Sequence, residues 1–128
     1  MQKLLVRPEA DNKTIMEQEI FTAKLSNIRI SSTKLVLVAN LVNKMPVEKA
    51  ITQMSFYPKK GARYVQKLIE SAVANAKHNN GVRAKDLVIS RIIVGQALTY
   101  KRGRPASRGK YSRILKRGSN LTIELAKK

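Results

Sequence analysis

Residues 100–119 read YKRGRPASRGKYSRILKRGS and contain eight cationic side chains but no acidic one. Apolar, β-rich runs flank this segment on both sides, LVISRIIV at 87–94 and LTIEL at 121–125. Two such runs joined through a charged, glycine-punctuated segment are typical of a β-hairpin. Each unpaired cation would cost several kcal/mol to bury. We therefore predict a long basic arm over about residues 94–114 that protrudes from the domain and lies against a polyanion.

The composition indicates what kind of polyanion this is. The chain has 128 residues, 43% of them hydrophobic, which corresponds to one domain with a modest core. Its 26 Lys and Arg against 8 Asp and Glu give a formal charge of +18. Residues 1–23 have a net charge of −1, so residues 24–128 carry +19. Nucleic acid is the default partner of such a basic domain, and an anionic membrane surface is the weaker alternative.

The same composition argues against other classes of protein. The chain has no cysteine and one histidine, which excludes disulfides and disfavours a metal site, and we predict no metal and no cofactor. No apolar run approaches the roughly 20 residues of a membrane helix. Residues 1–23 lack the hydrophobic block of a secretory signal, and their four acids are atypical of a mitochondrial presequence, so we expect no cleavable leader here. We interpret them as an N-terminal extension that is poorly ordered or bound to a partner.

Periodicity in residues 24–128 predicts a single α+β domain. The elements expected before the arm are a strand over 24–30, a helix capped by Ser31 or Ser32, and two helices that open at Pro46 and Pro58, the last stopping at residues 79–81. Together with the strands that flank the arm, this order predicts three helices packed on one face of a small antiparallel sheet.

Two cationic clusters accompany predicted helix starts. Arg29, Ser31 and Lys34 would suit a phosphate, or they belong to an ordinary capped helix with solvated charges, and the sequence leaves both readings open. Lys59, Lys60 and Arg63 lie at the start of the third helix. Cations oppose the helix dipole there unless an anion lies between them, so this cluster favours anion binding.

The other polar residues give weaker evidence for a functional site. Asn75 and His78 lie on one flank of the third helix, which is more often a solvated surface than a site. No serine or cysteine nucleophile pairs with His78 by motif and no carboxylate pair is evident, so we predict that the protein is not an enzyme. Tyr100 and Tyr111 flank the arm and are the pair of tyrosines that we expect to stack on bases.

Five stretches of residues 24–128 match one protein family in order. They are Ile28-Arg29-Ile30-Ser31 followed by Lys34, Met45–Ala50, Phe56–Lys60, Glu70–Ala76, and Arg108-Gly109-Lys110 followed nine residues later by Asn120–Leu125. On these residues the chain resembles the large-subunit ribosomal protein family that is numbered twenty-two in bacteria and seventeen in eukaryotic cytosolic ribosomes.

The resemblance implies the fold predicted above and a structural, non-enzymatic role. Members of the family bind and bridge large-subunit ribosomal RNA, and their arm lines the nascent-peptide exit tunnel. The implied partners are that RNA, the nascent peptide and neighbouring large-subunit proteins, including ribosomal protein four near the tunnel constriction. The implied location is a ribosome, in the bacterial cytoplasm or the mitochondrial matrix. We do not expect an obligate homo-oligomer.

The clusters and the resemblance together predict which residues contact RNA. They are Arg29, Ser31, Lys34, Lys59, Lys60, Arg63, Asn75, His78, Arg91, Lys101, Arg102, Arg104, Arg108, Lys110, Arg113, Lys116 and Arg117. The tip expected to face the tunnel is Arg102, Gly103, Arg104, Pro105, Ala106 and Ser107. Family members usually have arginine where this chain has Ala106, and often where it has Lys110, so contacts of its tip are expected to differ.

An alternative reading is an architectural DNA-binding protein with a basic β-ribbon arm. Such a protein would usually need a dimer with two arms, yet no long apolar helix is left over for an obligate interface. A monomer in solution would count against this alternative.

Overall fold

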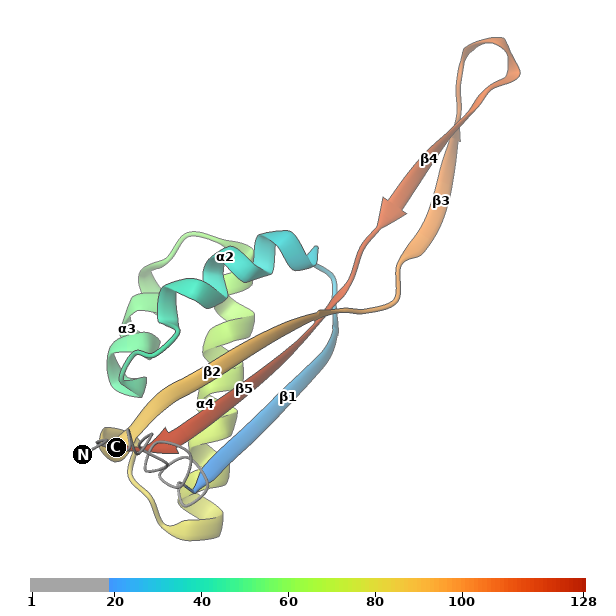
Figure 1. The fold of residues 1–128 in the computed structure, drawn as a ribbon. Helices are drawn as coiled ribbons and strands as arrows, with labels where there is room; N and C mark the ends of the chain where they lie inside the picture. The colour runs from blue at the N-terminus through green and yellow to red at the C-terminus, as the bar shows by residue number, and fades with distance from the viewer. Residues whose placement is uncertain (1–18) are drawn as a thin grey trace, which may run out of the picture.

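The structure, a computed structural model, describes residues 19–128 as an α+β domain with a protruding arm (Figure 1). In chain order its helices and strands are β1 Ile20–Ile28, α2 Ser32–Val42, α3 Val47–Phe56, α4 Lys60–Asn80, β2 Leu87–Gln96, β3 Tyr100–Pro105, β4 Tyr111–Lys116 and β5 Ser119–Lys127. Three helices, a small antiparallel sheet and a hairpin arm confirm the predicted fold class.

The main sheet has β5 at its centre, with β1 and β2 antiparallel on either side. Strand periodicity places alternate side chains on opposite faces. In β5 the side chains of Leu121, Ile123 and Leu125 are buried, whereas those of Thr122 and Glu124 between them are only half-buried. One face of the sheet is therefore the floor of the core.

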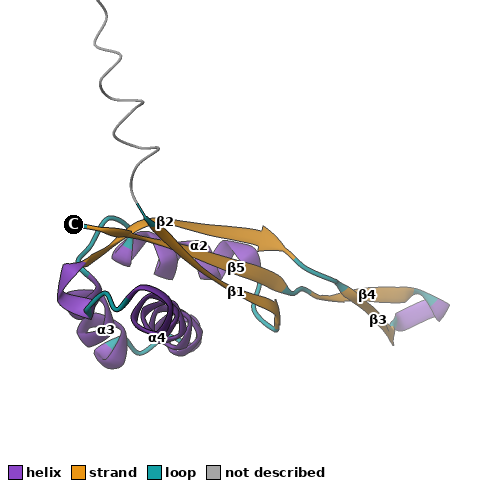
Figure 2. Ribbon diagram, turned by 90° about the horizontal axis from the view of Figure 1, so that it is seen from below, coloured by secondary structure: helices purple, strands orange, loops and turns teal. Residues whose placement is uncertain are grey.

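The three helices cover that face (Figure 2). Helix α4 lies along β1 and β5 and buries an apolar stripe, and α2 packs on β2. The buried residues of the helices are Leu35, Val38, Ala39 and Val42 in α2, Val47, Ala50 and Met54 in α3, and Gly61, Ala62, Val65, Leu68, Ile69, Ala72 and Ala76 in α4. These spacings of three and four residues are those from which the sequence predicted the helices.

The helix ends follow their local chemistry. Helix α3 begins directly after Pro46, and α4 ends at Gly81, whose φ of 65° is the left-handed conformation that glycine adopts freely. The N–H of Gly81 donates to the carbonyl of Lys77 at 3.0 Å. Ser31 does occupy the N-cap position of α2, but its side chain makes no capping hydrogen bond. The predicted serine cap is therefore wrong in its chemistry, although its position is right.

The first strand differs from the prediction. It spans Ile20–Ile28 rather than 24–30, so four residues assigned to the N-terminal extension belong to the sheet. Phe21 and Ala23 are buried and pair with Leu125 and Ile123 of β5. In the sequence, the acidic residues of the segment 1–23 hide the alternation of Phe21 and Ala23 with their neighbours. The pairing of these residues with β5 makes the segment a strand. Residues 1–18 of the predicted extension lie outside the described residues.

The arm also lies slightly later than predicted. Strands β2 and β5 stay paired as far as Gln96 and Ser119, beyond the expected start at residue 94. Strands β3 and β4 then form a separate two-stranded sheet from the pair Tyr100–Lys116 to the pair Pro105–Tyr111. The arm extends from the end of the sheet opposite the C-terminus (Figure 1).

Candidate nucleic-acid interface

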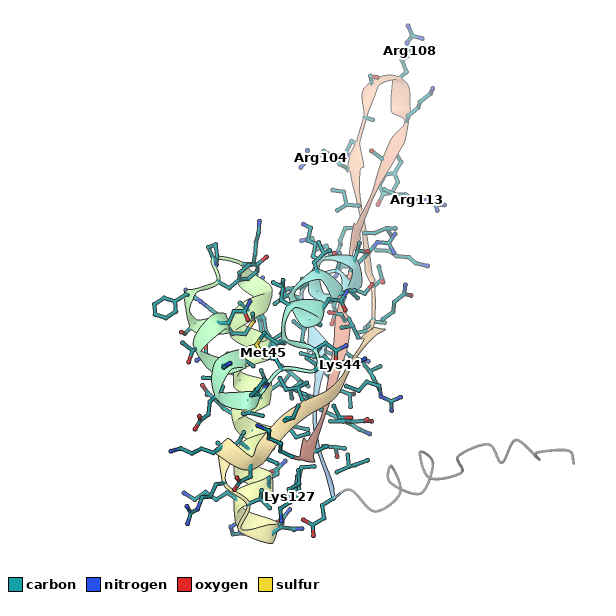
Figure 3. The ribbon with its side chains drawn as sticks, turned by 60° about the vertical axis from the view of Figure 1, so that its left-hand side comes forward. Lys44, Met45, Arg104, Arg108, Arg113 and Lys127 are labelled. Carbon is teal, nitrogen blue, oxygen red and sulfur yellow. The ribbon has the colours of Figure 1, made fainter. Side chains whose placement is uncertain are left out.

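The arm presents its cations on a ribbon that contacts little else. Every residue of β4 is exposed, and in β3 only Gly103 is partly covered. Arg104, Arg108 and Arg113 point away from the ribbon into solvent (Figure 3). A two-stranded ribbon of this kind is only marginally stable by itself in water. The cations of the arm are therefore exposed along both strands, where an anionic surface can contact them.

Two local devices shape the arm. The ring of Tyr111 lies directly over Gly103, so a Cβ at this position would require the exposed Tyr111 side chain to move. The turn at Ser107–Gly109 has left-handed φ values of 57° at Arg108 and 69° at Gly109, and the N–H of Ala106 donates to the carbonyl of Lys110 at 2.7 Å. Of the predicted tip, Arg102–Pro105 are part of β3, and Arg108 lies at the apex of the arm (Figure 3).

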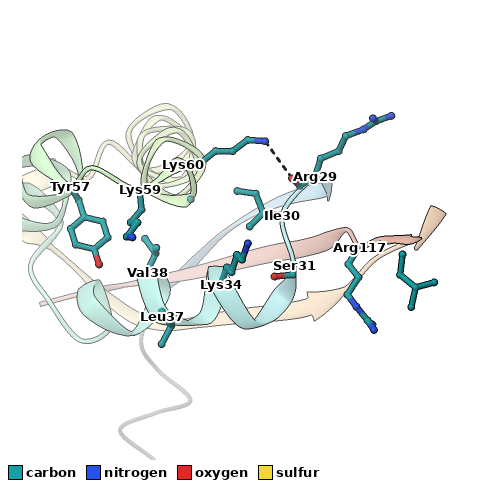
Figure 4. A pocket seen from close by; sticks show the side chains of 12 residues that line it. Arg29, Ile30, Ser31, Lys34, Leu37, Val38, Tyr57, Lys59, Lys60 and Arg117 are labelled. Carbon is teal, nitrogen blue, oxygen red and sulfur yellow. Dashed lines mark hydrogen bonds between the residues drawn. The ribbon is translucent and has the colours of Figure 1, made fainter. Parts of the chain in front are cut away.

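A cleft of about 670 Å³ lies where the arm joins the domain (Figure 4). It brings together the two cationic clusters that the sequence separates by some 25 residues. Its cationic and hydroxyl lining residues are Arg29, Ser31, Lys34, Lys59, Lys60 and Arg117. We call this the cationic cleft. It forms because the starts of α2 and α4 and the link between β4 and β5 all lie at the same end of the domain.

The electrostatics of the cationic cleft are one-sided. It is lined by five cations and by no acidic side chain of residues 19–128. Neither α2 nor α4 has an acidic residue in its first turn or a side-chain cap, so the free N–H groups at both starts add positive potential. The Nζ of Lys60 donates only a long hydrogen bond, 3.5 Å, to the carbonyl of Arg29. These groups can hold phosphate oxygens, which supply the missing negative charge.

Apolar and aromatic side chains also line this cleft, and they were not predicted as part of a site. They are Ile30, Leu37, Val38, Tyr57 and Leu115. The sequence indicates this apolar lining only weakly. Helix α2 is apolar on almost every side, so the pattern does not distinguish the outward-facing Leu37 from a core residue. Leu37 is in fact 67% exposed. The cleft can therefore contact sugars or side chains as well as phosphates.

Of the RNA contacts predicted outside the arm, Asn75, His78 and Arg91 lie away from the cationic cleft. Asn75 donates to the carbonyl of Thr22 at 3.4 Å, and His78 is exposed near the end of α4. Arg91 forms a two-point pair with Glu124, at 3.1 Å from Nε and 3.0 Å from one Nη. These hydrogen bonds and the charge of Glu124 raise the pKa of Arg91. Arg63 adjoins the cleft on the outer side of α4, beside Lys59 and Lys60.

No helix within residues 19–128 is long and apolar enough to cross a membrane. Over the same residues, no three His, Cys, Asp or Glu side chains gather as they would around a metal ion.

Comparisons with known proteins agree with the sequence resemblance. A family described as ribosomal protein L22p/L17e matches residues 23–126. The chain is 42% identical over 117 residues to the large ribosomal subunit protein uL22 of Jannaschia sp. (strain CCS1), covering 91% of this chain and 87% of that protein. It is 45% identical over 107 residues to the uL22 of Rickettsia peacockii (strain Rustic), covering 84% and 90%. The uL22 of Cereibacter sphaeroides (strain ATCC 17029 / ATH 2.4.9) is 40% identical over 117 residues, covering 91% and 92%. The chain therefore belongs to the ribosomal protein L22p/L17e family.

Proposed function

We propose that this protein is a structural constituent of a large ribosomal subunit that binds and bridges large-subunit ribosomal RNA. The observation that supports this most is the cationic cleft, where five cations from three separate segments converge without an acidic partner. Such a site neutralises phosphates where distant RNA segments approach one another, which is the role of a bridging protein rather than of an enzyme.

Recognition by this surface rests on shape and charge. The deep major groove of A-form RNA is closed to side chains, so a protein contacts mainly phosphates, 2′-hydroxyls and unpaired bases. The lysines and arginines of the cleft and arm meet the phosphates, with Arg able to bind two oxygens at once. We expect little sequence readout from these contacts, since phosphate contacts position a protein without specifying bases.

The arm is proposed to line the nascent-peptide exit tunnel. At about 3.3 Å per residue, the six-residue strands β3 and β4 extend the arm by roughly 20 Å before the turn at its apex. The residues proposed to face the tunnel are Arg102–Ser107, and we include Arg108 in this proposal because it lies in the turn at the apex. The nascent peptide and ribosomal protein four are the partners proposed for this end.

Contacts with neighbouring large-subunit proteins have a separate support. Helix α2 exposes Val36, Leu37 and Leu41, and Phe56 at the end of α3 is 83% exposed. Leu37 and Leu41 are four residues apart and therefore lie on one face of α2, and contiguous exposed apolar surface marks interaction sites. We propose that these residues pack against neighbouring proteins or RNA in the assembled subunit.

Sedimentation of a native lysate through a sucrose gradient in high salt tests the location. We expect the protein, followed by mass spectrometry, to migrate with the large subunit. Migration with chromosomal DNA would overturn the proposal and favour the architectural alternative.

Binding to a large-subunit ribosomal RNA transcript tests the mechanism. If about eight phosphates are neutralised, the slope of log affinity against log salt should be roughly −6 to −7. Replacing Lys59 and Lys60 by glutamine should make the slope shallower by about 2. The matched control is glutamine at Lys77 and Lys85, which lie outside the cleft. A wild-type slope shallower than about −2 would contradict the phosphate-binding mechanism.

A further inference from the structure

A second, smaller cavity lies beside the cationic cleft, at the root of the arm, and has a volume of about 260 Å³. We call it the root cavity. The residues that form its walls are Ile28, Arg29, Leu98, Tyr100, Lys116 and Arg117. Its volume is below the range of about 300–1,000 Å³ of pockets for drug-sized ligands, so it suits one small planar group.

The root cavity is built from backbone that is held in place. The N–H of Asn27 donates to Oδ1 of Asn120 at 3.0 Å, and the hydroxyl of Ser119 donates to the carbonyl of Ile30 at 2.9 Å. The N–H of Ala97 donates to the carbonyl of Gly118 at 3.1 Å. Three chain segments therefore meet at fixed positions around the cavity, whose frame exists before any ligand arrives.

One aromatic ring in this cavity has two cations beside it. The guanidinium Cζ of Arg29 lies 5.4 Å from the ring centroid of Tyr100, and that of Arg102 lies 5.8 Å from it. No acidic side chain of residues 19–128 lines the cavity. The π-face of Tyr100 itself attracts the two guanidinium groups, so the ring and the cations together form one aromatic and cationic surface on which a base can stack.

The residues around the root cavity favour a nucleobase over a phosphate alone. Leu98 is 65% exposed and Tyr100 is 38% exposed, so this site leaves apolar and aromatic surface in contact with water. A phosphate would pair with Lys116 and Arg117 but would leave Leu98 and Tyr100 uncovered. A nucleobase would cover both, since unpaired bases stack on aromatic rings and on guanidinium planes.

We propose that the root cavity takes a single unpaired nucleotide of the bound RNA. Its base packs against Tyr100 and the guanidinium of Arg29, and its phosphates face Lys116 and Arg117. This inference rests on the proposed function and adds to it one site that holds a base, beside a cleft that holds phosphates. A base within a continuous helix could not enter, because its faces are already stacked.

The test compares two probes of equal charge on the full-length protein. One probe is a single-stranded hexaadenylate, and the other is an abasic ribose-phosphate hexamer of the same length. We expect the wild-type protein to bind the hexaadenylate more tightly than the abasic hexamer at one fixed salt concentration. Tyr100→Leu should weaken hexaadenylate binding by about five- to 150-fold, the range that corresponds to stacking of one base.

Matched variants show whether the effect belongs to the cavity. Tyr100→Phe keeps the ring and should retain the preference for the hexaadenylate, and Ile93→Ala, at an exposed apolar side chain of β2 outside the cavity, should retain it as well. Equal wild-type affinity for the two probes would overturn the inference while leaving the proposed function in place. Loss of the preference in Ile93→Ala but not in Tyr100→Leu would also overturn it. Failure of the wild-type protein to bind either probe would count against the proposed function itself.

Discussion

The arm and the domain that carries it are stabilised in different ways. In the domain, β5 lies between two strands and beneath three helices, and Ile123 and Leu125 are completely buried. In the arm, β3 and β4 pair only with each other, and nearly every side chain is exposed. The same backbone pairing therefore serves a packed core in one region and a charged ribbon in the other. A high charge density is compatible with a folded protein when it is confined to segments that the core does not need.

Removing the arm should give the largest change in RNA binding with little change in folding. We expect a protein in which Asn-Gly replaces Lys101–Leu115, joining the paired residues Tyr100 and Lys116, to unfold cooperatively. The replacement removes six cations, so the salt slope for ribosomal RNA should become shallower by about 4 to 5. Urea denaturation and RNA titration measure the two effects. Loss of the cooperative transition would show that the arm belongs to the core.

Truncating one core side chain should instead change the stability of the fold strongly and RNA binding little. Ile123→Ala removes a fully buried side chain from the central strand, and we expect it to lower the free energy of unfolding by about 2–5 kcal/mol. The matched control is Ile114→Ala in the arm, where the side chain is 36% exposed and the loss should be within about 0.5 kcal/mol. Urea denaturation measures both. Similar losses at the two positions would contradict the distinction between core and arm.

The junction of the two regions should show an intermediate effect. A Cβ at Gly118 would lie 3.0 Å from the carbonyl oxygen of Leu98 and 3.4 Å from that of Ile28. We expect Gly118→Ala to cost about 1–3 kcal/mol, because backbone must move to admit it. Gly95→Ala, on the same hairpin with open space around it, should be neutral or stabilising by up to about 1 kcal/mol. If thermal unfolding ranks the two variants equally, the close approach at the root is not a constraint.

The surface ion pair should matter least for folding. Arg91→Gln breaks the pair with Glu124 on an exposed part of β2, and we expect the smallest stability change of the four, reduced further by added salt. The raised pKa of Arg91 adds stability that is fully present below the ordinary, strongly basic pKa of an arginine in the unfolded chain and is lost only as pH rises above it. The effect of Arg91→Gln should therefore not depend on the titration of Arg91 near neutral pH. A large destabilisation by Arg91→Gln would mean that the pair supports the sheet.

Much of the fold followed from short-range patterns. The buried stripes of α2 and α4 were visible as spacings of three and four residues, and Gly81 marked the end of α4 where the structure has its left-handed turn. The start of β1 was missed, because Phe21 and Ala23 lie in an acidic segment and only their pairing with Leu125 and Ile123 makes them a strand. The absent capping bond at Ser31 was missed for a similar reason, since a good capping residue does not determine its own rotamer.

The candidate site could also be predicted from the sequence only in part. Each cationic cluster could be identified alone, but no local pattern indicated that Lys34, Lys60 and Arg117 line one cleft. Arg91 and Asn75 were grouped with the RNA contacts, and the structure gives both of them hydrogen-bond partners within the protein.

The sequence by itself determined the helices, the basic arm, the charge that calls for a polyanion and the family, because these depend on composition, periodicity and residues close in the chain. Only the tertiary structure decided where β1 begins, which cations converge at the cleft, and that Arg29 reaches the ring of Tyr100. The physical reason is that contacts between distant residues are set by how the helices pack on the sheet and by the register of β5, and neither is encoded in any single segment.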